Sequence, residues 1–159
     1  MGSGRIAAGA LADPFTDYAQ KLGYKDVANI ANLGLEFPFV SLVAKKTYVR
    51  DQADSVQRFV RAYTEAIAIY KNQRETAIKV TQKYTGIKDP AILASTVNFY
   101  APKLAAVPYP TPGGIRFVLD QIVVRDPRAK SVDPESFIDS RFVKALDESR
   151  YIKSLYPAR

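Results

Sequence analysis

The sequence predicts an α/β protein in which a few strands in the first third of the chain are followed by a layer of helices. Short apolar runs bounded by Gly, Pro and Asp occupy the first 50 residues, as expected of buried strands. From Asp51 onward, apolar residues recur at the spacing of amphipathic helices. Because amphipathic helices need a surface to cover, and a sheet is that surface in mixed folds, these two observations favour the α/β class.

Three strands and one helix are expected before residue 51. The strand candidates are short apolar runs at residues 6–11, 27–30 and 39–44. After the first of them, Asp13-Pro14 is expected to open a helix over residues 15–22, which Gly23 ends. Three strands are few for the helices that follow. We therefore expect an incomplete sheet, as in a fragment of a larger protein or a chain that assembles through an open sheet face.

Proline at the first helical position marks most of the expected helix starts. A preceding Asp or Thr can cap the helix, and the N–H that proline lacks has no partner at that position in any case. The four pairs are Asp13-Pro14, Asp89-Pro90, Thr111-Pro112 and Asp133-Pro134. Further starts are expected at Asp51, Asn72 and Asp139, and helix ends at Gly86 and Pro102. The longest helix, after Asp51, carries an apolar stripe made of Val56, Phe59, Val60, Tyr63, Ala66, Ile67 and Tyr70.

The residue types that are absent exclude several kinds of chemistry. The chain has no Cys and no His, so it offers no thiolate or imidazole to a metal, no thiol nucleophile and no Ser–His relay. It also has no glycine loop with dinucleotide or Walker spacing. We therefore expect a binding protein with no catalytic residue, no metal and no cofactor, and not an enzyme.

The net charge of +7, from 23 basic and 16 acidic residues, is spread along the chain. Because no run of more than two consecutive basic residues occurs, we expect no nucleic-acid partner. A mildly positive field suits a small anionic ligand or an acidic partner surface. No stretch approaches the roughly 20 apolar residues that a membrane helix needs.

The strongest local candidate for a site is the junction between the first expected strand and the first expected helix. It consists of Asp13, Pro14, Phe15 and Thr16. In α/β proteins, ligands bind at the edge where strands end and helices begin, and helix N–H groups there favour anions. The alternative is that the Asp13 carboxylate satisfies those N–H groups itself, and the two interpretations are compatible.

A series of motifs runs in a fixed order through nearly the whole chain. They are residues 4–15 (GRIAAGALADPF), 19–24 (AQKLGY), Phe37-Pro38, 59–66 (FVRAYTEA), 83–86 (KYTG), 114–120 (GIRFVLD), 134–139 (PESFID) and 142–156. Their order and spacing resemble the periplasmic solute-binding proteins of ABC importers for nitrate, sulfonates, taurine and thiamine precursors.

The resemblance implies a two-lobed, periplasmic-binding-protein type II-like fold, present here as a helix-rich C-terminal portion with few strands. Residues 1–37 would be a remnant of the second lobe, and residues 38–159 the hinge strand and the helical part of the first lobe. The protein would be periplasmic, with its signal peptide outside this chain. It would bind a small anionic solute of sulfonate or nitrate type and deliver it to ABC permease subunits. Phe37, Pro38 and Ser41 of the crossing segment would join the junction residues as ligand contacts.

Two positions depart from the family pattern. Ser41 stands where taurine-type members carry an Asp for the ammonium group of the ligand, which argues against an aminosulfonate. Arg150 stands where the family tends to have Gly. The enzymatic branch of this fold depends on a histidine, and this chain has none.

Two other interpretations stay open. One is a stand-alone α/β interaction module that binds no small molecule and forms a homodimer through the open edge of its sheet. The other is an enzyme that uses carboxylate and lysine side chains.

Overall fold

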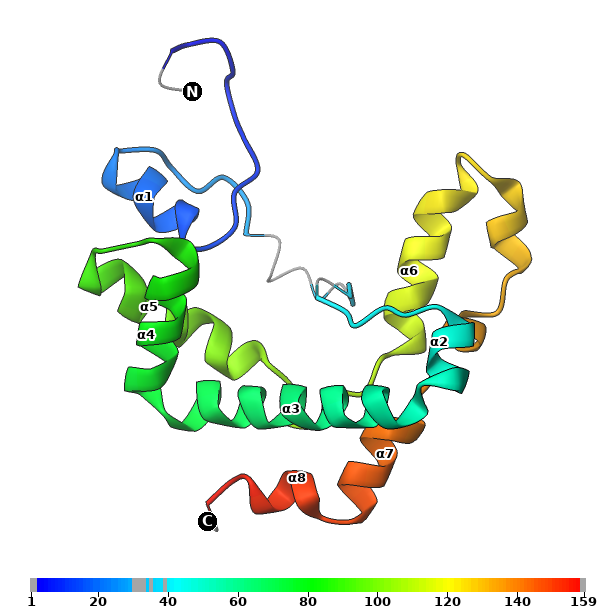
Figure 1. Ribbon diagram of the computed structural model, residues 1–159. Coiled ribbons are helices and arrows are strands. Elements are labelled where there is room, and N and C mark those ends of the chain that lie inside the picture. The colour runs from blue at the N-terminus through cyan, green and yellow to red at the C-terminus, as the bar shows by residue number, and fades with distance from the viewer. Residues whose placement is uncertain (1–2, 30–33, 35, 39, 158–159) are drawn as a thin grey trace. The chain divides into compact units, whose positions relative to one another are not determined.

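A computed structural model describes residues 3–29, 34, 36–38 and 40–157 of the chain. Helices make up 62% of the structure, and the described residues contain no strand. The α-helices are α1 (Phe15–Lys21), α2 (Lys46–Asp51), α3 (Ala53–Asn72), α4 (Arg74–Thr85), α5 (Pro90–Tyr100), α6 (Pro112–Val123), α7 (Arg141–Glu148) and α8 (Tyr151–Ser154) (Figure 1). Three short 3₁₀ helices are η2 (Ala101–Lys103), η3 (Pro127–Ser131) and η4 (Pro134–Phe137).

The predicted α/β class, with its type II-like sheet, is therefore wrong. The described parts of the three strand candidates leave their large side chains in solvent: Ile6 is 56% exposed, Val27 91% and Val43 90%. A strand exists only where a neighbouring strand takes up its backbone N–H and C=O groups, and the described residues supply no such neighbour. The open sheet edge proposed for a homodimer is consequently also missing from this part of the chain. Ile30 and Phe39 lie outside the described residues.

Helix starts that combine an Asp or Thr cap with proline are largely confirmed. The Asp89 carboxylate accepts hydrogen bonds from two backbone N–H groups of α5, at 2.9 and 3.3 Å. Thr111 caps α6 and Asp133 caps η4 in the same way, with N–H···O distances of 3.3 and 3.0 Å. Asp126 also caps a helix, η3, whose start was not among those predicted from the sequence. The ending of α4 at Gly86, which has a φ of +73°, is also as predicted.

Three other predicted starts are wrong in detail. Asp13 makes no capping bond to α1. Asp51 is the last residue of α2, where its carboxylate pairs with Arg50 at 2.7 Å, and Asn72 is the last residue of α3. A capping residue needs non-helical backbone ahead of its helix, and Asp51 and Asn72 are still in the preceding helical turn.

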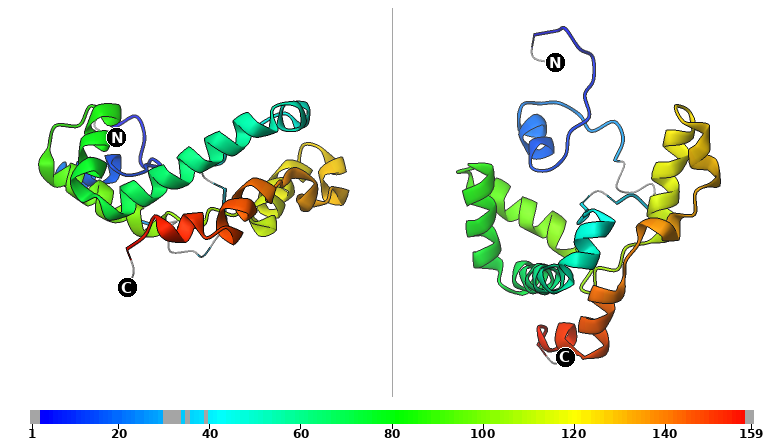
Figure 2. Two further views of the ribbon diagram at one scale, coloured as in Figure 1. Left: turned by 60° about the horizontal axis from the view of Figure 1, so that its bottom comes forward. Right: turned by 45° about the vertical axis from the view of Figure 1, so that its right-hand side comes forward.

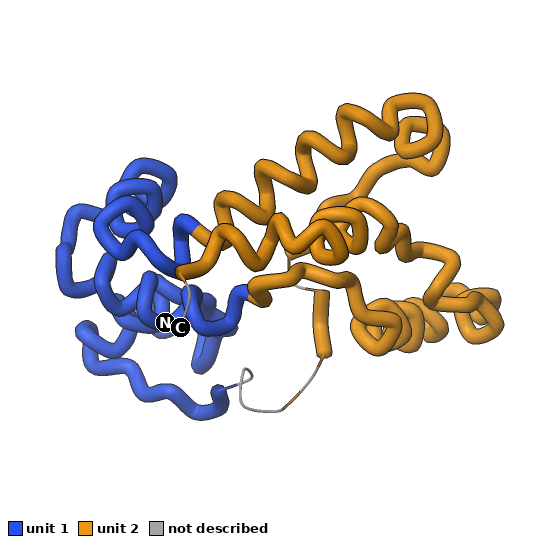
Figure 3. The backbone as a smooth tube through the Cα atoms, turned by 90° about the horizontal axis from the view of Figure 1, so that it is seen from below, with its two compact units in different colours: residues 1–30, 69–104 blue, residues 31–68, 105–159 orange. Residues whose placement is uncertain are grey.

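The chain forms two compact units, each made from two separate segments. Unit 1 comprises Met1–Ile30 and Ile69–Leu104, and unit 2 comprises Ala31–Ala68 and Ala105–Arg159 (Figure 3). The chain thus passes between the units three times. At one of these points α3 continues unbroken, and the left view of Figure 2 shows it as one long helix. The two lobes expected at residues 1–37 and 38–159 differ in their bounds from these two units. Their assignment as lobes stays a prediction.

Each unit has its own apolar core. The core of unit 2 lies between α3, α7 and α8 and is formed by Val60, Phe142, Val143, Leu146 and Ile152. The smaller core of unit 1 is formed by Ile87, Ile92 and Leu93, with Ile78 packed against it. The predicted stripe of α3 is only partly buried, since Val60 and Ile67 are inside while Phe59 is 59% exposed.

Candidate functional site

Two polar contacts hold α1 against α5 within unit 1. The Tyr100 hydroxyl, at the end of α5, donates a hydrogen bond of 3.0 Å to the backbone carbonyl oxygen of Asp13. The Lys21 ammonium, at the end of α1, lies 2.6 Å from the carboxylate of Asp89, which caps the start of α5. Each contact joins the start of one helix to the end of the other. The two helices therefore run antiparallel and are held together at two points.

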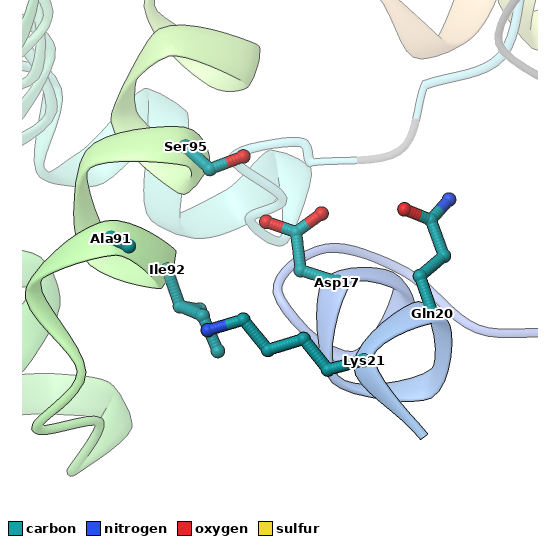
Figure 4. Close-up of a pocket in the computed structure, with 6 residues that line it drawn as sticks. All are labelled: Asp17, Gln20, Lys21, Ala91, Ile92 and Ser95. Carbon is teal, nitrogen blue, oxygen red and sulfur yellow. The ribbon is translucent and has the colours of Figure 1, made fainter. Parts of the chain in front are cut away.

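A depression of about 410 Å³ lies between these two helices (Figure 4). It is lined by Asp17, Gln20, Lys21, Ala91, Ile92 and Ser95. The carboxylate of Asp17 and the hydroxyl of Ser95 point toward one another from facing helices in Figure 4. The depression therefore brings together polar groups from two helices, α1 and α5, that lie far apart in the sequence.

The hydrogen-bonding capacity of this depression is mostly unused within the described chain. Asp17, Gln20 and Ser95 have no side-chain hydrogen bond or ion pair there, whereas Lys21 is occupied by Asp89. The Lys21 ammonium, together with backbone N–H groups of α5, lowers the pKa of Asp89 below its ordinary value. The side chains left for a ligand are thus a carboxylate, an amide and a hydroxyl.

The predicted junction residues lie next to this depression. The Thr16 hydroxyl donates a hydrogen bond to the Asp13 carboxylate, so the structure brings these two predicted residues together. Pro14 is buried and Phe15 is 61% exposed. Asp13 lies in the turn that enters α1, two residues before the first residue of that helix.

The other three predicted contacts belong to unit 2. The ring of Phe37 packs edge-on against that of Phe117, with 5.8 Å between centroids. Pro38 lies beside Gly114 at the start of α6, where a methyl group on the glycine would be 3.3 Å from the proline ring. Ser41 is exposed. Phe37 and Pro38 thus contact α6 of unit 2, and the role of all three residues as ligand contacts stays a prediction.

Sequence reasoning missed Asp17, Gln20, Lys21 and Ser95. Asp17 and Gln20 had a local signal, because they lie three residues apart on one face of the helix predicted over residues 15–22. Ser95 had none, since its approach to α1 depends on how α5 packs.

The described residues contain no group of three or more His, Cys, Asp or Glu that could hold a metal ion. Within the same residues, no helix combines the length and apolar character needed to cross a membrane. No protein-family model, curated protein or solved structure matches the chain.

Proposed function

We propose that this chain is the substrate-binding component of an ABC importer, and that the depression between α1 and α5 holds part of a small polar solute. The order of motifs quoted above supports the transport role. Binding without covalent chemistry suits a chain that lacks both His and Cys.

The observation that carries the proposal is the orientation of α1. Its polar residues Asp17, Gln20 and Lys21 line the depression against α5, while Phe15 and Leu22 are 61% and 76% exposed. A surface helix normally buries its apolar stripe and exposes its polar face. Departures from that pattern concentrate at functional sites, where a ligand uses the polar groups.

The lining side chains favour a solute that donates hydrogen bonds. Asp17 is an unpaired carboxylate, and the charge of Lys21 is already matched by Asp89. A bare anion such as nitrate would meet the Asp17 carboxylate without a free cation beside it, and like charges at close range repel. We therefore propose, against the expectation drawn from Ser41, that an amine or another N–H group of the solute faces Asp17, and that any anionic group of the solute lies outside this depression.

The test compares taurine with ethanesulfonate, which lacks only the amine, together with nitrate and 4-aminopyrimidine. Binding is followed by amide chemical shifts in ¹⁵N-labelled protein. We expect an amine-bearing solute to shift the signals of residues 17, 20 and 95 and to bind at least tenfold more tightly than ethanesulfonate. Asp17→Asn should abolish that preference. Glu75→Gln, which removes an exposed carboxylate from α4 of the same unit, should keep it.

A panel in which no solute shifts these signals would contradict the proposal. So would tighter binding of ethanesulfonate or nitrate than of taurine and 4-aminopyrimidine, because it would place an anion where the structure presents a carboxylate.

A second candidate function, binding of a second copy of this chain, is favoured by a different observation. Phe15, Tyr18 and Leu22, on α1 and its C-cap, recur at helical spacing and are 61%, 37% and 76% exposed. An exposed apolar stripe is a common protein-contact surface. Light scattering measures the mass of the chain and of Phe15→Glu. A larger mass that falls to that of a single chain in the variant would favour this second function.

A further inference from the structure

A second depression of about 410 Å³ lies in unit 1, where the last turn of α3 and the start of α4 meet the end of α5. It is lined by Tyr70, Lys71, Arg74, Val97, Asn98, Ala101 and Pro102. Two of these residues are cations and none is acidic. Its polar chemistry is therefore opposite to that of the depression between α1 and α5.

The Lys71 ammonium is fixed in this depression. It donates hydrogen bonds to the backbone carbonyl oxygens of Ala101, at 2.7 Å, and of Leu104, at 2.8 Å. An ammonium group has three N–H donors, so one donor remains. The carbonyl end of a helix carries about half a negative charge, which the full charge of Lys71 exceeds.

Arg74 and Asn98 form a second fixed pair. An Arg74 guanidinium N–H donates to the side-chain oxygen of Asn98. This bond turns the oxygen of the amide toward Arg74 and leaves the amide NH₂ as a donor, while the guanidinium keeps further N–H donors. The Tyr70 hydroxyl is paired with that of Thr81 at 3.3 Å. The free polar groups that line the depression are thus hydrogen-bond donors.

Helix stability explains Lys71 but not Arg74. Lys71 supplies carbonyl caps at the end of α5, which is a structural role. Arg74 is the first residue of α4, and a cation is unfavourable at the N-terminus of a helix. Its presence beside Lys71 places two positive charges at one depression without a carboxylate in the lining.

The remaining wall is apolar. Val97 is 3% exposed, and Ala101, Pro102 and the ring of Tyr70 complete the lining. We propose that this depression binds a small organic carboxylate. Its oxygens would accept hydrogen bonds from Lys71, Arg74 and Asn98, and its short alkyl tail would lie against Ala101 and Pro102. The proposal is independent of the solute site between α1 and α5.

The experiment titrates the full chain with butyrate and, separately, with butyramide, which has the same shape and no charge. Amide signals of ¹⁵N-labelled protein are followed at low ionic strength. We expect butyrate to give saturable shifts at residues 70, 71, 74 and 98, and butyramide to give none. Arg74→Gln should raise the dissociation constant at least fivefold. Asn98→Asp, which puts a carboxylate opposite Arg74, should abolish binding.

Lys79→Gln is the matched control, because it removes one exposed cation from the same helix outside the depression. It should leave butyrate binding within twofold of the unsubstituted chain. Equal shifts with butyramide, shifts confined to other residues, or an Arg74→Gln variant that binds as well as Lys79→Gln would each overturn the proposal. Both variants alter exposed side chains, and unchanged amide spectra without ligand would show that they are folded.

Discussion

The Tyr100 hydroxyl donates a hydrogen bond of 3.0 Å to the carbonyl oxygen of Asp13, which joins the last residue of α5 to the turn that enters α1. Partial burial, with the negative charge of Asp13 as a smaller cause, raises the pKa of Tyr100 above its ordinary value. The hydroxyl is therefore protonated, and able to donate, throughout the neutral range.

Removing this hydroxyl should loosen the junction. We expect Tyr100→Phe to lower the free energy of unfolding by about 1 kcal/mol, the typical net contribution of one such hydrogen bond. Amide exchange at residues 15–21 should become faster at the same time. Tyr84→Phe is the control, because Tyr84 is 79% exposed. Equal exchange in both variants would show that the Tyr100 bond does not hold α1.

The ion pair between Lys21 and Asp89 predicts a pH dependence. The pKa of Asp89 is lowered in the folded chain, first by Lys21 and then by the N–H groups that it caps. Its stabilising effect is therefore complete above the unfolded-state pKa of about 4, and is lost as the pH falls through the lower folded pKa. Asp89→Asn keeps a capping side chain but removes the charge.

We expect the melting temperature of Asp89→Asn to fall less between pH 5 and pH 2 than that of the unsubstituted chain. Asp26→Asn, at an exposed position of the same unit, should retain the full slope. Thermal unfolding followed by circular dichroism measures both. Parallel pH profiles for all three proteins would contradict the assignment.

Arg150 has a φ of +60°, the left-handed conformation that favours glycine. This conformation costs a non-glycine residue roughly 1–2 kcal/mol, part of which the greater chain entropy of unfolded glycine offsets. We expect Arg150→Gly to raise stability by up to about 1 kcal/mol, or about 2–4 °C in melting temperature. Arg150→Ala removes the same side chain but keeps the conformation, and should give no gain. A gain of equal size in both variants would mean that the side chain, not the backbone, is unfavourable.

The Tyr151 hydroxyl donates a hydrogen bond to the Glu65 carboxylate, and the Arg61 guanidinium lies 4.2 Å from the centre of the Tyr151 ring. The bond from Tyr151 is the largest cause of the lowered pKa of Glu65, ahead of Arg61. We therefore expect Tyr151→Phe to raise the pKa of Glu65, measured by NMR titration of its carboxyl carbon. Tyr48→Phe changes a tyrosine that is 51% exposed and should leave that pKa unchanged.

Ile152 connects α8 to the core of unit 2 and is 1% exposed. Truncating a fully buried isoleucine costs about 2–5 kcal/mol, because apolar contacts are lost and a cavity remains. We expect Ile152→Ala to destabilise by that amount in urea unfolding. Val124→Ala, at a position that is 87% exposed, should stay within about 0.5 kcal/mol of the unsubstituted chain.

The predicted starts at Asp89, Thr111 and Asp133 and the end at Gly86 were accessible from sequence because capping involves atoms only two or three residues apart. The same logic was wrong at Asp51. Asp51 is the last residue of the short helix α2, and α3 begins two residues later, at Ala53. The sequence pattern did not show the break between these two helices. Local patterns therefore located α1 and α3 to α7 but not α2 or α8, and they placed some boundaries poorly.

The sequence by itself determined that most of the chain after residue 51 is helical, and it located several of the helix starts. It also excluded cysteine and histidine chemistry. Only the tertiary structure decided that the apolar runs near the N-terminus are not strands, because strand hydrogen bonds go to a second segment whose presence no local pattern records. It also decided the candidate site, since Asp17 and Ser95 face one another only after α1 packs against α5. Contacts between distant residues depend on packing that a local sequence pattern does not contain.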